Sequence, residues 1–366
     1  MKFIPWAKPS LNKVDKEYLN KSFDSNWISG GYYVQKFERN FAKFLKIRKT
    51  LTVNNGTSAI HLVYLSLNLK KDDEIIFPAY GYMAASNIAL QLGFKPVFVD
   101  VDQETFCINA DKIKKKISKK TKLIVVINTY GNICDFNEIT KIGKENGIFI
   151  LEDAAESLGS TLNNRQSGTF GDFSTFSFQA TKTITTGEGG MVTTKLPINI
   201  YNKMKLYRSH GIKKERYFHI LPGNNFRLTN IQAAIGCSQL KRINLIKKRR
   251  SEIFLLYSEI FKTHKSIQLQ KFKKNINPMV WTLAVLLNTK KKLKRNDLIK
   301  KLLKKNIETR NAFYSPNNLD IYKKYRSNDL KNSDNISKNL ICLPIYNTLS
   351  NKEVKYIART FIGLIS

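Results

Sequence analysis

The sequence predicts an α/β fold whose central sheet is mostly parallel. Between residue 51 and about residue 195, short apolar segments alternate with segments of helical periodicity, which is the pattern of parallel strands joined by helices. Residues 123–127 and 148–151 are unbroken apolar runs, as strands buried on both faces of a sheet should be. Polar residues and glycine follow the strand ends, where such sheets bind their ligands.

The other elements of this region follow from the same patterns. Further strands are expected at residues 51–53, 74–77 and 96–100, and in a segment that ends near Phe178. Thr229 can cap a helix that runs through Leu240 and continues into a long helix near Leu256.

The pattern changes after about residue 250. A strand is expected at 280–287, a helix at 296–305, and an amphipathic terminal helix marked by Val354, Ile357 and Phe361. We therefore predict a large domain of residues 1–250 and a smaller α+β domain of residues 251–366.

Composition narrows the class of protein. A chain of 366 residues is long enough for two domains. It has no apolar run of about eighteen residues, so we expect no membrane span, and its first nine residues lack the apolar core of a secretory signal. The scattered cysteines favour neither a zinc site nor a disulfide framework. They are Cys107, Cys134, Cys237 and Cys342. We expect a cytoplasmic protein without a metal.

The formal net charge of +34 could indicate a nucleic-acid partner. The excess is mostly lysine, however, and it is spread along the chain and interleaved with apolar residues at helical spacing, as at 300–304. This arrangement favours solvated helix faces, so we expect no nucleic-acid partner. A positive field would still attract an anionic substrate such as a nucleotide diphosphate.

Three segments at strand ends carry candidate chemistry, and each has a structural alternative. Residues 55–59 open a helix, so their amides and two hydroxyls suit a phosphate, although a plain glycine turn with a helix cap explains them equally well. Asp153 follows a strand, where it could pair with a cationic ring nitrogen or cap a turn. A tyrosine within residues 78–82 could stack on a flat ring or pack in the core.

Lys182 stands in the most informative segment of the chain. It lies between an apolar strand that ends near Phe178 and the glycine turn at 187–190. A lysine that forms a Schiff base must be partly desolvated so that its amine can be neutral, and rigid flanks allow this. The alternative is a lysine exposed in a loop. A phosphate site, an aromatic plate, a carboxylate and a reactive lysine together describe a site for pyridoxal phosphate.

With these segments in place, the chain resembles the DegT/DnrJ/EryC1/StrS family of sugar aminotransferases, which are fold type I enzymes that use pyridoxal phosphate. The matching motifs occur in order along nearly the whole chain. They include residues 27–30, 56–59, 100–102, 130–131, 152–155, 187–190, 209–211, 225–227 and 232–236. The segments 183–186 and 307–310 resemble the branch that includes GDP-perosamine synthases.

The resemblance implies a role for each matching residue. Lys182 would carry the cofactor and move the proton, Asp153 would pair with the pyridine nitrogen, and Tyr82 would stack on the ring. Asn225 would reach the cofactor phosphate of a neighbouring subunit, so that a homodimer shares its active sites. The phosphate would bind to Gly56, Thr57, Ser58 and Ser177. The substrate would bind to Trp27, Ser29, His219, Arg310 and Asn317.

Several residues depart from the pattern of the family. Asn128 stands where many members have histidine, Asn317 where this branch usually has a histidine on the substrate side, and Gln179–Thr181 replaces a Gly-Asn pair. Glu156 replaces a glutamine near the phenolic oxygen of the cofactor, so its carboxylate must be protonated or turned away.

The leading interpretation is an aminotransferase that converts a nucleotide-linked keto-deoxysugar to an aminosugar, with an amino acid, glutamate, as donor. Gln179 also resembles members that act on cyclitols, so a cyclitol aminotransferase is an alternative. A related sugar dehydratase is a second alternative, but its best-known variant has histidine in place of the lysine. A DNA-binding regulator is the last alternative, and no helix-turn-helix segment is evident.

Overall fold

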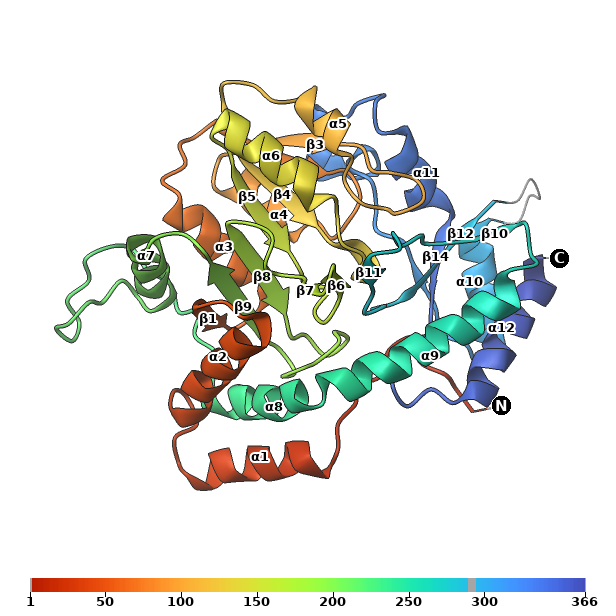
Figure 1. Cartoon of the computed structure of the whole chain (residues 1–366), viewed down its shortest axis with the longest axis horizontal. Coiled ribbons are helices and arrows are strands. Elements are labelled where there is room, and N and C mark those ends of the chain that lie inside the picture. The colour runs from red at the N-terminus through yellow and green to blue at the C-terminus, as the bar shows by residue number, and fades with distance from the viewer. Residues whose placement is uncertain (1, 289–293, 366) are drawn as a thin grey trace.

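The computed structural model describes residues 2–288 and 294–365, and a seven-stranded sheet forms its centre (Figure 1). Its strands lie in the order β1-β9-β8-β5-β4-β2-β3. They are β1 (Lys49–Val53), β2 (Glu74–Pro78), β3 (Lys95–Val99), β4 (Thr121–Ile127), β5 (Phe149–Asp153), β8 (Phe173–Ser177) and β9 (Gly190–Thr194). Strand β9 is antiparallel to both of its neighbours, and all other pairs are parallel. The predicted, mostly parallel sheet is confirmed.

Helices cover both faces of this sheet, because its central strands carry apolar side chains on both sides. One face packs against α3 (Gly56–Ser66), α4 (Ala84–Gln91) and α7 (Ile198–Arg208). The other face packs against α5 (Ala110–Lys114) and α6 (Phe136–Asn146). The carboxyl ends of the parallel strands are thereby left free of helices and can bind a ligand.

The helix predicted after Thr229 is broken in two. Thr229 caps α8 (Asn230–Lys241) as expected, and its hydroxyl accepts the amide of Gln232 at 3.3 Å. A second helix, α9 (Ile243–Phe261), follows after Arg242, whose guanidinium donates to Asp15 at 2.6 Å. That ion pair fixes the break against the first helix of the chain. The first two helices are α1 (Lys13–Asp24) and α2 (Tyr32–Leu45), and both pack on α8.

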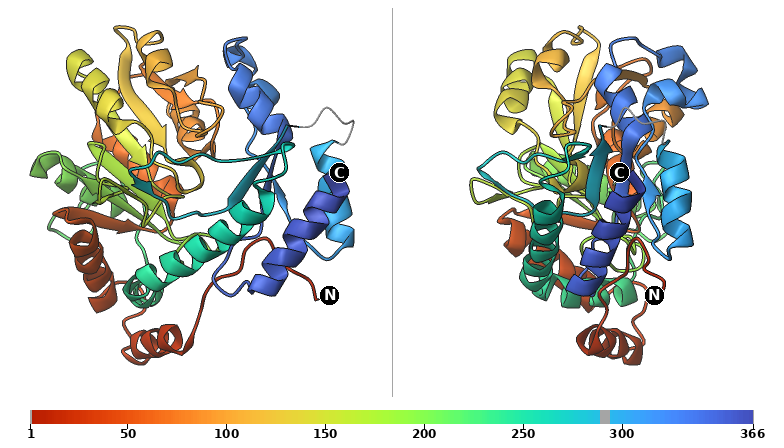
Figure 2. Two further views of the ribbon diagram at one scale, coloured as in Figure 1. Left: turned by 45° about the vertical axis from the view of Figure 1, so that its right-hand side comes forward. Right: turned by 90° about the vertical axis from the view of Figure 1, so that its right-hand side faces the viewer.

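A second, antiparallel sheet lies beyond α9, on the side of the molecule where both termini are found (Figures 1 and 2). Its strands, in spatial order, are β10 (Ile267–Leu269), β12 (Leu283–Leu287), β14 (Leu340–Leu343) and β13 (Arg310–Asn311). It shares a core with α9, α10 (Arg295–Lys304) and α12 (Asn351–Ile365). Ile4 is buried in the same core, and it pairs with Ile307. The domain division at residue 250 stays a prediction, since α9 continues through it.

The strand expected at 280–287 begins only at Leu283. The first two residues of the expected strand are instead held by a buried arginine of α9, Arg250, whose guanidinium donates to the carbonyl oxygens of Val280 and Trp281 at 3.2 and 2.9 Å. The short strands β6 (Thr161–Leu162), β7 (Arg165–Gln166) and β11 (Ile276–Asn277) form a third, small sheet.

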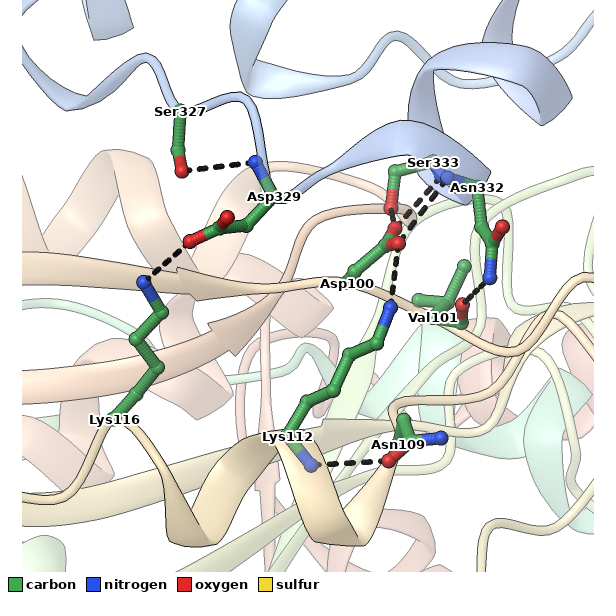
Figure 3. Close-up of polar contacts among 9 residues, drawn as sticks. All are labelled: Asp100, Val101, Asn109, Lys112, Lys116, Ser327, Asp329, Asn332 and Ser333. Carbon is green, nitrogen blue, oxygen red and sulfur yellow. Dashed lines mark hydrogen bonds and ion pairs between the residues drawn. The ribbon is translucent and has the colours of Figure 1, made fainter.

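A buried carboxylate joins the C-terminal part of the chain to the central sheet (Figure 3). Asp100 follows β3 and accepts the side-chain amine of Lys112 at 2.8 Å. It also accepts the backbone amides of Asn332 and Ser333, at 3.1 and 2.8 Å, in the first turn of α11 (Lys331–Asn339). We call these four residues the Asp100 cluster. Burial by itself would raise the pKa of Asp100, but the contacts with Lys112 and Ser333 outweigh it and lower that pKa.

Candidate active site

A cavity of about 850 Å³ lies at the carboxyl ends of the parallel strands, and we call it the main cavity. Its volume is in the range of cofactor sites. Eight of the residues predicted for the site line it. They are Gly56, Thr57, Ser58, Tyr82, Asp153, Glu156, Ser177 and Lys182. The tertiary structure therefore brings together segments that are more than a hundred positions apart in the sequence.

One end of the main cavity is formed by the start of α3 and the end of β8. Asn55 caps α3, and its side-chain oxygen accepts the amide of Ser58 at 2.8 Å. A Cβ atom on Gly56 would lie 3.1 Å from the Cβ of Ser177, so the glycine allows helix and strand to approach this closely. Amides at a helix start, together with three hydroxyl groups, form a set of donors suited to a phosphate.

Two buried carboxyl groups lie further along the main cavity. Asp153 ends β5, and its Oδ1 accepts the amide of Ala155 at 3.0 Å. Glu156 accepts the amide of Tyr130 at 3.0 Å through Oε2. Burial raises the pKa of both carboxyl groups, although the nearby Lys182 opposes the shift in each case. For Glu156, burial thus opposes the ionised form and the neighbouring ammonium group of Lys182 favours it.

Lys182 is held on a tight turn that follows β8. Its amide donates to the carbonyl of Gln179 at 2.9 Å, and the side chain of Gln179 accepts the amide of Thr181 at 2.8 Å. The side chain is only 14% exposed, and its Nζ lies 3.6 Å from Oε1 of Glu156. The same nitrogen lies 4.0 Å from the centre of the Trp281 ring. The lysine is therefore not the free loop lysine of the alternative interpretation.

Arg310 lies beside the main cavity rather than in it. It lines a smaller cavity of about 380 Å³, the side cavity, and forms an ion pair with Glu308 at 2.7 Å. The two cavities share four aromatic lining residues, so they adjoin. The shared residues are Trp6, Tyr82, Trp281 and Phe313. A substrate that extended from the main cavity could reach Arg310.

Asn317 and Asn128 serve the chain's own structure. The side-chain amide of Asn317 donates to Ser327 O at 2.9 Å and to Asp334 at 2.8 Å, and the residue lines neither cavity. Asn128 is buried and donates to Glu152 at 2.8 Å. The role predicted for Asn317 stays a prediction.

The remaining predicted residues line neither cavity of their own chain. Trp27 and Ser29 precede α2 and lie at the start of α8, where their carbonyls accept hydrogen bonds from Asn230. His219 and Asn225 lie in the loop between α7 and α8, and Asn225 accepts from Arg227 at 3.0 Å. That loop projects from the body at the left of Figure 1. The roles assigned to these four residues stay predictions.

The sequence analysis missed the aromatic wall of the main cavity. Trp6, Trp281 and Phe313 come from three distant segments, and all of them line both cavities. Trp281 lies in an apolar run that predicts a strand, and a single tryptophan in such a run is normally expected to pack in the core. No local pattern therefore indicated that Trp281 belongs to the site. Among the described residues, no group of three metal-binding side chains is found and no helix has the length and apolarity to span a membrane.

Known proteins match both the sequence and the structure of this chain. The model of the DegT/DnrJ/EryC1/StrS aminotransferase family matches residues 9–362. A GDP-perosamine synthase of Escherichia coli O157:H7 is 39% identical over 363 residues, which are 98% of each chain. The Helicobacter pylori aminotransferase PseC, involved in the biosynthesis of pseudoaminic acid, superposes with a TM-score of 0.95 at 28% identity and covers 100% of this chain and 99% of its own.

A third similar protein bears on the cofactor. The pyridoxal phosphate form of a sugar aminotransferase from Streptococcus pneumoniae, Spr1654, superposes with a TM-score of 0.92 at 26% identity, covering 98% of this chain and 97% of its own. The chain belongs to the DegT/DnrJ/EryC1/StrS aminotransferase family. It is a pyridoxal phosphate-dependent aminotransferase with the fold that the sequence predicted.

Proposed function

We propose that this enzyme transfers an amino group from glutamate to the keto carbon of a nucleotide-linked deoxysugar. The observation that carries the substrate class is the 39% identity, over 98% of both chains, to a GDP-perosamine synthase. The basic chain favours an anionic diphosphate substrate. The adjoining side cavity, with the guanidinium of Arg310, gives such an extended substrate room beyond the reacting carbon.

The residues of the main cavity have separate tasks in this proposal. The start of α3 and Ser177 would hold the cofactor phosphate, and the carboxylate of Asp153 would hold its ring nitrogen in the protonated form. When bound, pyridoxal phosphate supplies an electron sink for the carbon that carries the amine. Lys182 Nζ would move the proton between that carbon and the cofactor, since its amine lies inside the cavity.

The test is an amination screen on the purified enzyme. Glutamate labelled with nitrogen-15 is offered with GDP- and UDP-linked keto-deoxysugars, with the ketone at C3 or at C4, and separately with a keto-cyclitol, and the products are analysed by mass spectrometry. We expect transfer of the label to one nucleotide sugar, and none with the Lys182→Ala variant. Amination of a keto-cyclitol alone would overturn the proposed substrate class. Loss of a hydroxyl without incorporation of the label would identify a dehydratase instead.

We further propose that the enzyme is a homodimer whose subunits share their active sites. Asn225 does not line the main cavity of its own chain, whereas its neighbour Phe226 does. The loop that carries Asn225 also exposes Tyr217 and Phe218, which are 73% and 60% exposed. Exposed aromatic side chains on a projecting loop are typical of a surface that binds another chain.

Mixing two inactive variants tests the shared site. Neither Asn225→Ala nor Lys182→Ala should be fully active alone, but a mixed dimer would have one site with both native residues. Activity should therefore rise modestly after the two are mixed and allowed to exchange subunits. A fully active monomer in sedimentation, or no recovery after confirmed exchange, would contradict the proposal. A cytoplasmic location is also proposed, consistent with four free and buried cysteines.

A further inference from the structure

Trp281 contacts the turn that carries Lys182 in two ways. Its ring lies under the lysine, with Nζ 4.0 Å from the ring centre. Its indole nitrogen donates to the carbonyl of Thr181 at 2.8 Å. Every other lysine–aromatic contact among the described residues is longer, from 4.9 to 5.9 Å. The approach to Trp281 is therefore the closest of its kind in the described chain.

The ring of Trp281 is itself held in place. Trp6 meets it edge-on at 5.6 Å, and Tyr130 is stacked on it at 6.1 Å. The guanidinium of Arg250, which is buried in α9, donates a hydrogen bond to the carbonyl oxygen of Trp281 at 2.9 Å. The side chain is only 8% exposed. A ring fixed on so many sides presents one face, at a constant position, to the lysine.

The Lys182 amine has a second contact, with an acidic side chain. Oε1 of Glu156 lies 3.6 Å from Nζ, and the other oxygen of Glu156 is bound by the amide of Tyr130. Asp153 is the other acidic group near the amine. An aromatic face and a carboxylate together form a binding place for an ammonium ion.

We propose that Trp281 is a positioning residue that receives the Lys182 amine whenever that amine is not bonded to the cofactor. The inference rests on the proposed role of Lys182. Over the two half-reactions the amine would leave the cofactor once, remain in the cavity and rejoin the cofactor only at the end, and a long flexible side chain has many other rotamers. The Trp281 face keeps the amine inside the cavity, close to the acids, and shields it from solution.

The test measures how fast the amine of Lys182 reacts in the cofactor-free protein. Trace acetic anhydride at one fixed pH labels lysines, and mass spectrometry compares the Lys182 peptide with that of the exposed Lys119. In Trp281→Leu, which removes the aromatic face, we expect about a three- to fivefold rise in labelling at Lys182. Trp281→Phe loses the bond to Thr181 but keeps a ring, so it should stay near the wild-type rate.

A matched variant separates the aromatic face from simple opening of the cavity. Trp6→Leu also removes a tryptophan that lines both cavities, but the amine of Lys182 lies over the ring of Trp281 and not over that of Trp6. It should raise the labelling of Lys182 less than Trp281→Leu does, because Tyr130 and Arg250 still hold Trp281 in place. Equal rises in Trp6→Leu and Trp281→Leu, equal rises in Trp281→Phe and Trp281→Leu, or no rise in Trp281→Leu would each overturn the proposal. Unchanged labelling at Lys119 and unchanged melting temperatures confirm that the variants are folded.

The labelling needs neither a sugar nor the cofactor. It can therefore succeed even if the amination screen fails, and the two proposals can fail separately. As a further readout, Trp281→Leu should lower kcat more than it raises the KM for glutamate. A positioning role predicts this split because the lysine acts after the donor has bound.

Discussion

Two regions of this molecule bury carboxyl groups, and they treat the charge in opposite ways. In the Asp100 cluster, one carboxylate accepts hydrogen bonds from an ammonium group, two backbone amides and a hydroxyl group (Figure 3). In the main cavity, Asp153 and Glu156 have few donors, and Lys182, 3.6 Å from Glu156, is the cation that faces them among the described residues. The pKa is lowered at Asp100 and raised at Asp153 and Glu156.

We interpret the difference as follows: the charge of Asp100 stabilises the fold, whereas the acids of the main cavity serve the reaction. Donors around Asp100 join α11 to the end of β3, so the ionised form stabilises the folded chain. The acids of the main cavity keep free lone pairs, which raises the free energy of their ionised forms before any ligand binds. A site that must receive a cationic ring nitrogen leaves its carboxylates incompletely bound in this way.

Replacing Asp153 should have the largest effect on activity and little effect on the fold. In Asp153→Asn the ring nitrogen of the cofactor loses its anionic partner, so turnover should fall about a hundredfold or more. The stability of the cofactor-free protein should be equal or higher, because a buried charge is removed. Steady-state rates and urea unfolding measure the two effects. Near wild-type turnover would remove Asp153 from the chemistry.

Replacing Asp100 should have the opposite pattern of effects, with a loss of stability rather than a direct loss of activity. In Asp100→Asn the ion pair with Lys112 is lost and an amide group faces the donors of Ser333. We expect the free energy of unfolding to fall by about 2 kcal/mol. Urea unfolding at neutral pH measures it, and Ser333→Ala, which removes one donor, should cost less. A fully stable Asp100→Asn protein would show that the cluster does not hold α11 in place.

The pH dependence of stability should also have opposite signs in the two regions. The folded-state pKa of Asp100 is lowered, so its contribution is present above about pH 4 and is lost as the pH falls through the folded value. The folded-state pKa of Glu156 is raised, so its contribution is present below about pH 4 and is lost as the pH rises through the folded value.

A Glu156→Gln variant tests the pH dependence expected for Glu156. The glutamine oxygen can still accept the amide of Tyr130, but it has no charge to bury. The stability of the cofactor-free variant should therefore fall less than that of the wild type as the pH rises from about 5 to 8. Urea unfolding at several pH values gives both slopes. A steeper fall in the variant would mean that the ion pair with Lys182 outweighs burial.

The smallest effect is expected at the edge of the Asp100 cluster. Asp329 forms an ion pair with Lys116 at 3.0 Å (Figure 3), and its side chain is 69% exposed. Solvent and salt screen such a pair, so Asp329→Asn should leave the urea midpoint unchanged within error. It is the matched control for Asp100→Asn. A large loss at Asp329 would indicate that surface charge, and not the buried carboxylate, anchors α11.

The sequence by itself was sufficient for the mostly parallel character of the sheet and for most of the cofactor end of the cavity. Apolar runs such as 123–127 mark strands through side-chain burial, a property of neighbouring residues. Parallel strands end at one edge of a sheet, so the sequence placed Asp153 and Ser177 at the same edge, and the pairing of β5 with β8 brings them close together. Lys182 followed from its local frame, and the family motifs supplied the cofactor.

Only the tertiary structure decided what surrounds the lysine. The contact between Trp281 and Thr181 joins residues 100 positions apart, and the carbonyl of Trp281 is bound in turn by Arg250 of α9. The same is true of Asp100, whose donors come from α11. Such contacts arise when separately folded layers pack together, and no periodicity along the chain records them. Local patterns determined which elements form, while packing between distant elements determined which side chains meet.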